Sequence, residues 1–196
     1  MSNRQTTLRA RVSAAILEAA AALLADRGEQ ASMADVAAAA GMARATVYRY
    51  FPNKEALFEA LGRLAVEEAG ERLQAGRLDE VAVPEAFERA VRALVAVGNS
   101  FVVVSRTSAR PDPAEFERRV ASPLRRLIER AQTLGEVRDD LPASWLMESL
   151  VGIVVSVLQT RPSLGVEDTV AGITSLFLDG ARPPGKMTEG SGAIPG

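Results

Sequence analysis

The amino-acid sequence predicts an all-α fold, in which a short three-helix unit at the N-terminus precedes a larger helical body. Apolar residues recur at three- to four-residue spacing along most of the chain. Residues that favour the beginning or the end of a helix stand between these periodic segments. The β-branched run at residues 101–104 has no second strand to pair with, so we expect it to be helical as well.

The composition narrows the class of protein. With 196 residues and 47% hydrophobic content, the chain can form one large or two small domains with an ample core. No apolar stretch reaches the length of a membrane span, and the N-terminus has no apolar signal segment, so we expect a cytoplasmic protein without a membrane partner. The chain has no cysteine and no histidine. We therefore expect no disulfide, no metal site, no cofactor and no enzymatic activity.

The first predicted helix carries apolar residues from Val12 to Leu24 on one face and stops near Gly28. The next helix begins with a capping box, in which Ser32 precedes Asp35 by three residues. It ends at Gly41, which suits the left-handed conformation that follows many helices. The first helix is expected to support the short helices that follow it.

A second short helix follows the turn at Gly41. Arg44 lies at its N-terminal end and Tyr48 one turn later, whereas Val47 and Phe51 face the opposite side and are expected in the core. Two short helices around a tight turn form a helix-turn-helix, whose second helix enters the major groove of double-stranded DNA. A guanidinium at that end can donate two hydrogen bonds to guanine.

The net charge is distributed unevenly. Residues 1–54 carry a charge of +3 and the remainder carries −5. A small basic unit on an acidic body is typical of a DNA-binding head on a regulatory domain, although chance can produce such unevenness over so few residues. Arg4, Arg9 and Arg11 form a basic arm, either for the minor groove or as a solvated tail.

The segment Tyr48–Leu57 resembles the signature of the TetR family of bacterial one-component repressors. It contains Tyr48, Tyr50 and Phe51 followed by Asn53, Lys54, Glu55 and Leu57. The resemblance covers residues 10–60, and beyond it the chain resembles only the general plan of the family. A weaker likeness is the Gly-x-x-Arg-x-Asp pattern at residues 135–140.

The resemblance implies a set of DNA-contacting residues in the head. Ala34 and Ala45 stand where many members of the family carry polar or base-reading side chains, so Arg44 and Tyr48 are left with more of the base recognition. The predicted DNA-binding residues are Ser32, Arg44, Ala45, Thr46, Tyr48, Arg49, Tyr50 and Lys54.

The body is predicted to continue in helices. Asn53 caps a long helix that runs to about Gly76, and Pro84 opens the next one. Pro123 should kink or restart a helix near Ser122. Two late helices occupy about residues 142–159 and 166–181. The predicted organisation is a helix-turn-helix domain at 1–54, a ligand-binding and dimerisation domain at 55–182 and a disordered tail at 183–196.

The two late helices are apolar on more than one face. We expect one face to pack inward and the other to form a four-helix bundle with a second copy, although a fully buried pair in a monomer is an alternative. The family resemblance also implies a homodimer. The residues predicted for its interface are Leu150, Val154, Val157, Val170, Ile173 and Phe177.

The resemblance places an effector pocket among the central helices of the body. The candidates for its lining are Phe87, Phe101, Arg106, Phe116, Trp145 and Met147. Plain core packing is the alternative for each of them. Because these side chains are mostly apolar, we expect a small hydrophobic effector.

The function predicted from these features is a ligand-responsive repressor that binds a palindromic operator as a homodimer. A ligand-independent activator or a nucleoid-type DNA-binding protein is an alternative. A helical enzyme would have to rely on scattered carboxylates such as Glu115, Glu117 and Glu148. A scaffold protein is the remaining alternative.

Overall fold

The computed structural model describes residues 2–27, 30–106, 112–159 and 164–184, with the side chains of these ranges except residues 2–6, 25 and 99–106. The described ranges form helices joined by turns and contain no strand, which confirms the all-α prediction. None of these helices has the length and apolarity needed to cross a membrane. The elements are α1 Ser2–Arg27, α2 Met33–Ala39, α3 Arg44–Tyr50, α4 Lys54–Ala75, α5 Val83–Arg106, α6 Pro113–Phe116, η2 Glu117–Ala121, α7 Ser122–Thr133, α8 Ala143–Gln159 and α9 Val166–Gly180.

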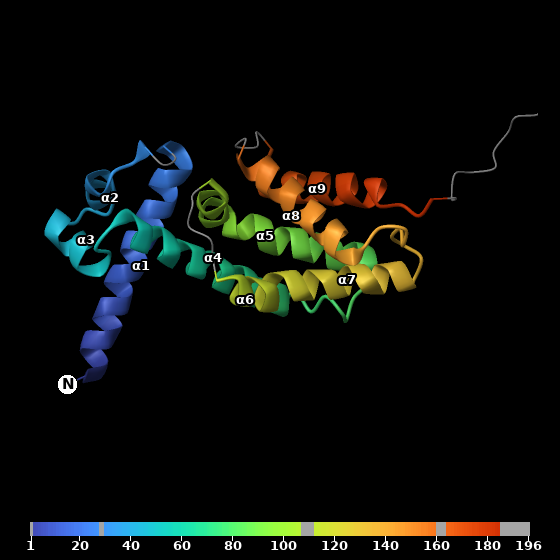
Figure 1. Cartoon of the computed structure of the whole chain (residues 1–196), viewed down its shortest axis with the longest axis horizontal. Helices are drawn as coiled ribbons and strands as arrows, with labels where there is room; N and C mark the ends of the chain where they lie inside the picture. Colours follow the sequence, from blue (N-terminus) through green and yellow to red (C-terminus); the bar gives the residue numbers. More distant parts are fainter. Residues whose placement is uncertain (1, 28–29, 107–111, 160–163, 185–196) are drawn as a thin grey trace, which may run out of the picture.

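The helices form two groups that are joined by α4 (Figure 1). One hydrophobic core lies among α1, α2, α3 and the first half of α4, and its last buried member along the chain is Leu61. The other core starts at Ala65 and includes residues of α5, α7, α8 and α9. Helix α4 therefore contributes to both cores, and the division predicted at residue 54 remains a prediction.

Helix α5 contains a break at Gly98. This residue has φ of 37° and ψ of −102°, a conformation that glycine adopts without steric cost and other residues rarely adopt. The backbone of residues 101–104 is helical beyond the break, as predicted.

The chain around Pro123 contains a π-helical turn. The turn η2 spans Glu117–Ala121, and α7 starts at Ser122, so the predicted restart is confirmed. Proline lacks an N–H group, and a wider turn before it accommodates the missing backbone hydrogen bond. Residues 107–111, before this region, lie outside the described residues, as do residues 185–196 of the predicted tail.

The bounds of the two late helices agree with the prediction, but the assignment of their faces was wrong. Five of the six residues predicted for the dimer interface are buried in the core of the protomer itself and cannot present an outward surface. They are Leu150, Val154, Val170, Ile173 and Phe177. Only Val157 remains partly accessible. The side chains that α8 and α9 expose are different ones, among them Trp145, Val166 and Leu176.

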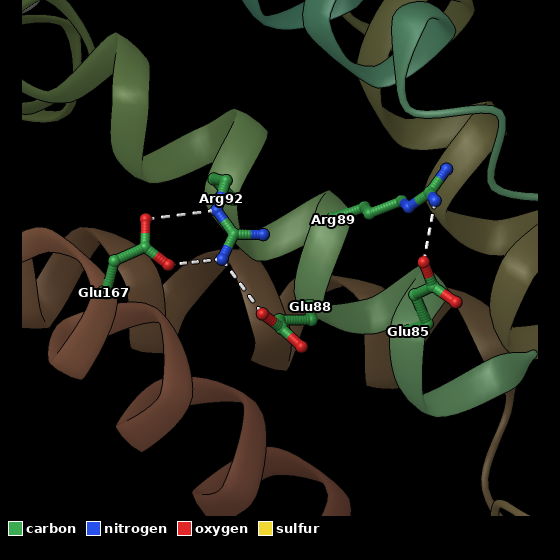
Figure 2. Close-up of polar contacts among 5 residues, drawn as sticks. All are labelled: Glu85, Glu88, Arg89, Arg92 and Glu167. Carbon is green, nitrogen blue, oxygen red and sulfur yellow. Dashed lines mark hydrogen bonds and ion pairs between the residues drawn. The ribbon is translucent and has the colours of Figure 1, made fainter.

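An arginine on α5 connects this helix to the start of α9 (Figure 2). The Arg92 guanidinium donates to both carboxylate oxygens of Glu167, with a distance of 3.3 Å from Nε to Oε1, and Nη2 also donates to Glu88 at 2.9 Å. Hydrogen bonding to Glu167 and then to Glu88 raises the pKa of Arg92, and the guanidinium in turn lowers the pKa of Glu167. The pair fixes the first turn of α9 against α5.

Glu167→Gln should lower the melting temperature at neutral pH. Because the folded-state pKa of Glu167 lies below its ordinary value of 4.5, the ion pair stabilises the fold above that pH. This contribution is lost as the pH falls through the folded-state pKa, so the difference in melting temperature between the variant and the wild type should disappear once the pH is below it. Thermal unfolding followed by circular dichroism across this range checks the expectation.

Glu88→Gln is the matched control, because it removes the charge of one ion pair with the same arginine within α5 and leaves the α5–α9 contact in place. Glu88→Gln should lower the melting temperature at neutral pH by less than Glu167→Gln does. Equal effects would show that the contact between helices adds nothing beyond the local pair.

Candidate nucleic-acid interface

The capping box at the start of α2 is present as predicted. The N–H of Ser32 donates to Asp35 Oδ2 at 2.8 Å, and its hydroxyl donates to the same oxygen at 2.6 Å. The N–H of Asp35 donates to Ser32 Oγ at 3.2 Å. These bonds fix the point at which α2 begins and set its direction relative to α1.

Gly41 makes the turn between α2 and α3. Its φ of 63° lies in the left-handed region, and the N–H of Met42 donates to the carbonyl of Ala37 at 2.9 Å across the turn. Helix α3 then starts at Arg44 after an N-cap alanine that provides no side-chain hydrogen bond. The turn places the short α3 against α2, which is the arrangement of a helix-turn-helix.

Helix α3 has one buried and one exposed face. Val47 is completely buried and Phe51, directly after the helix, is 6% exposed, so both belong to the core of the head as predicted. On the opposite side Arg44 is exposed and Tyr48 is 44% exposed. Ala45 and Arg49 are exposed one turn apart in a second row, and Thr46 is half-buried.

Tyr50 lies at the end of α3 between two arginines. The guanidinium carbon of Arg49 is 5.5 Å from the centre of the Tyr50 ring, and that of Arg9 on α1 is 5.9 Å from it. Contacts of this kind are attractive, because the face of an aromatic ring is electron-rich. They hold two positive charges beside the C-terminal end of α3.

Arg9 is a contributor to this surface that the motif did not reveal, because it lies on a different helix. The sequence placed Arg9 in a basic arm with Arg4 and Arg11, either for the minor groove or as a solvated tail, and not beside Tyr50. The N-terminal residues expected to form an arm are part of a helix instead, since α1 begins at Ser2.

Lys54 begins α4, directly after the capping residue. Asn53 accepts a hydrogen bond from the N–H of Ala56 at 2.8 Å, which confirms the predicted cap. The Lys54 ammonium lies 5.3 Å from the centre of the Phe58 ring. This position puts a cation at the positive end of the helix dipole, where a phosphate is favoured.

Ser32 is the predicted contact residue whose position argues least for DNA. Both of its hydrogen-bond donors bind the Asp35 carboxylate, so a phosphate would have to replace that carboxylate. The hydrogen bonds from the Ser32 side chain and backbone lower the pKa of Asp35, with smaller contributions from Arg27 and Arg44. Asp35 therefore remains charged at neutral pH and adds a local repulsion for phosphate.

The remaining surface can recognise DNA through two kinds of contact. Arg44 and Tyr48 lie one turn apart on the exposed face, where a guanidinium and a phenol can reach base edges. Arg49, Tyr50 and Lys54 lie toward the end of α3 and the start of α4, where they suit phosphate contacts that fix the orientation of the helix. Ala45 offers only a methyl group.

The four predicted pocket residues whose side chains are described lie in different environments. Phe87 is buried and packs on Phe177 with ring centres 5.4 Å apart, and Met147 is also buried in the core. Phe116 is half-buried against the same core. Trp145 is 54% exposed and does not line the interior. The side chains of Phe101 and Arg106 lie outside the described residues.

The structure contains a cleft elsewhere, between α4 and the η2–α7 segment. Four of its arginines lie on η2 and α7, more than 40 residues after α4 in the sequence, and no local pattern groups them with it. Within the described residues there is no cluster of three or more acidic side chains that would suit a metal ion.

Comparison of the sequence with known families matches residues 16–61 to the family described as "Bacterial regulatory proteins, tetR family". A curated relative, the HTH-type transcriptional repressor LfrR of Mycolicibacterium smegmatis, is 49% identical over 55 residues. The match covers 28% of this chain and only 29% of that relative. The similarity in sequence is therefore concentrated in the head.

Solved structures extend the similarity to the whole fold. The TetR-like transcriptional regulator LfrR from Mycobacterium smegmatis in complex with proflavine superposes with a TM-score of 0.75 and 26% identity, covering 88% of this chain and 97% of that chain. AibR in complex with isovaleryl coenzyme A and operator DNA gives a TM-score of 0.66 and 23% identity, covering 84% and 97%. The second likeness concerns the fold alone.

Ser32→Ala should lower the free energy of unfolding by about 0.5–2 kcal/mol, because it removes the side-chain half of the capping box. Urea unfolding of the purified protein measures the change. Glu59→Ala, at an exposed position on α4, is the control and should be close to neutral. Equal stabilities of the two variants would contradict the capping role of Ser32.

Proposed function

Because the chain belongs to the TetR family of bacterial regulatory proteins, we propose that it is a transcriptional repressor that binds operator DNA through α3. The observation that carries the proposal is the α2–turn–α3 unit, in which Arg44 and Tyr48 project from a helix whose other face is anchored by buried Val47. A protein with this role works in the bacterial cytoplasm, where the DNA is.

The family consists of transcriptional regulators and not of enzymes, in agreement with the prediction that the chain has no enzymatic activity. Two of the three carboxylates considered for an enzyme are engaged by arginines. Glu115 binds Arg118 at 2.6 Å, and Glu117 binds Arg125 at 2.8 Å. They stabilise the α6–α7 segment.

We further propose that the repressor acts as a homodimer on a palindromic operator. Exposed apolar side chains on the two late helices support this proposal, because Trp145, Val166 and Leu176 are each more than half accessible in the protomer. Gly152 and Gly172 are exposed on α8 and α9 and would allow close approach of a second copy. A two-fold axis would place two reading helices on half-sites about one helical turn, or a multiple of it, apart.

A small molecule is proposed to release the operator. LfrR and AibR have been solved with proflavine and with isovaleryl coenzyme A respectively, which supports ligand binding by a fold of this kind. The two heads of the dimer would lie at different distances in two conformations of the protein. The hydrophobic effector expected from the sequence would act by binding more tightly to one of these conformations than to the other. Helix α4, which is shared by both cores, connects the body to the head.

Arg44→Ala should weaken operator binding by about 1–3 kcal/mol per half-site and relax sequence preference, if the guanidinium reads a guanine. Lys54→Ala is the comparison and should weaken all DNA sequences alike, because a phosphate contact carries no base information. Fluorescence anisotropy at fixed salt, with operator and scrambled duplexes, separates these outcomes. Unchanged operator affinity in both variants would exclude α3 as the reading helix.

Leu176→Glu should convert the dimer into monomers, because it places a charge on the exposed apolar face of α9. Leu134→Glu is the matched control, since Leu134 is also exposed, at 60%, but lies at the end of α7. Sedimentation velocity at micromolar concentration should show monomers only for Leu176→Glu. A monomeric wild type, or a dimer in both variants, would contradict the proposed interface.

A further inference from the structure

A cleft of about 550 Å³ lies between α4 and the η2–α7 segment. Its lining includes the buried leucines Leu73, Leu78 and Leu127 together with arginines. Its volume falls in the range of about 300–1,000 Å³ that is typical of small-molecule sites. The residues that line it come from two stretches of the chain, 70–79 and 118–130, and meet only in the folded protein.

Five arginines line the cleft, namely Arg77, Arg118, Arg119, Arg126 and Arg130. The acidic group in the lining is Asp79. Arg77 is paired with Glu80, and Arg118 and Arg119 share the carboxylate of Glu115. After these carboxylates are counted, the surroundings of the cleft keep a positive charge.

Arg126 and Arg130 account for this excess, because neither makes an ion pair with a carboxylate in the described part of the chain. The hydrogen bond that Arg126 makes there is a long one, 3.5 Å, to Ser122 Oγ. Arg130 donates from Nη2 to the carbonyl of Val81 at 3.1 Å, while its buried Nε has no acceptor among the described residues. Guanidinium groups in this state keep donors available for a carboxylate or phosphate.

The backbone of η2 brings Arg118 and Arg119 close to α4. A methyl group on Gly70 would lie 2.8 Å from Cβ of Arg119, so the glycine is what permits η2 to approach α4. The π-helical turn of η2 shifts the register of the residues that follow it, and turns of this kind are frequent at functional sites. The structure thus holds two neighbouring arginines, Arg118 and Arg119, against one side of the cleft.

We propose that this cleft binds a small amphipathic anion, with an apolar part against its leucines and a carboxylate or phosphate group on Arg126 and Arg130. The cleft has the volume of a small-molecule site, and its leucines suit an apolar group beside the anionic one. The cleft lies on the C-terminal half of α4, about 24 Å along the helix from Lys54.

An anion bound by Arg126 and Arg130 contacts α7, and its apolar part reaches Leu73 on α4 at the same time. The α4 helix continues directly into the head, so a change in its position relative to α7 changes the position of α3. In this way the cleft is the effector site of the repressor. That the anion binds is inferred from the cleft alone. That its binding releases DNA rests on the proposed function.

The test uses full-length protein and four eight-carbon probes that differ only in the head group. Octyl phosphate and octanoate carry negative charge, octanol is neutral and octylamine is positive. Isothermal titration calorimetry should show one site per protomer for an anionic probe, and its affinity should fall as salt is added. The relative affinities of the two anionic probes distinguish a phosphate from a carboxylate as the preferred head group. Equal or tighter binding of octanol or octylamine, or no binding of either anion, would overturn the proposal.

The matched variants are Arg126→Gln and Arg125→Gln, on adjacent positions of α7. Arg125 is paired with Glu117 and does not line the cleft. Arg126→Gln should weaken the anionic probe about tenfold or more, and Arg125→Gln should leave its affinity almost unchanged. Equal affinities in both variants would exclude Arg126 from the site.

Release of DNA is measured separately with the same probes. If the protein binds the anion but does not bind DNA, the cleft is confirmed as an anion site and the proposed function is refuted. Binding of the anion without any loss of operator affinity would refute the regulatory part alone.

Discussion

Helix α4 is buried in two hydrophobic cores at once, and the arrangement of the whole chain depends on this. Its first half ends in the core of the head at Leu61, which is completely buried, and Ala65 begins the contribution to the core of the body. An α-helix keeps its own backbone hydrogen bonds when it moves, so it shifts as a rigid rod more easily than it bends. Any rearrangement of the body that moves α4 must therefore repack the head or carry it along. Helix α3 moves with α4, because Phe51 and Leu57 lie in the same core on either side of the cap at Asn53.

Much of the head could be predicted from the sequence, because its signals are local. The capping box at Ser32, the left-handed glycine at Gly41 and the cap at Asn53 each act within a few residues of the chain, and the structure contains all three. The division of α3 into a buried face with Val47 and an exposed face with Tyr48 also follows from helical spacing alone. The position of Arg9 beside Tyr50 could not be predicted in this way, since the packing of α1 against the end of α3 is not encoded in the spacing of either helix.

The body shows where such reasoning fails. Helix α8 is apolar on most of its circumference, so its pattern does not show which face packs inward. The choice of Leu150 and Val154 as outward residues was wrong because α5, α7 and α9 surround that side of α8, and their positions depend on the whole topology. The arginine cleft was missed for a related reason. Its walls are separated by some 40 residues of sequence, and an arginine that lines a cleft has the same local pattern as one on an open surface.

The energy needed for regulation is compatible with contacts of the kind the cleft offers. Moving a two-state protein from almost entirely one state to almost entirely the other takes about 5.5 kcal/mol of difference in binding free energy. In a homodimer two ligands share this requirement, so each needs to favour one state by roughly half of it. A hydrogen bond to a charged group contributes about 1.5–3 kcal/mol, so one or two contacts to Arg126 and Arg130 that exist in only one state would suffice. Contacts made equally in both states would raise affinity without moving the heads. The regulatory role therefore depends on whether the distance between α7 and α4 differs between the two states, more than on how tightly the cleft holds its ligand.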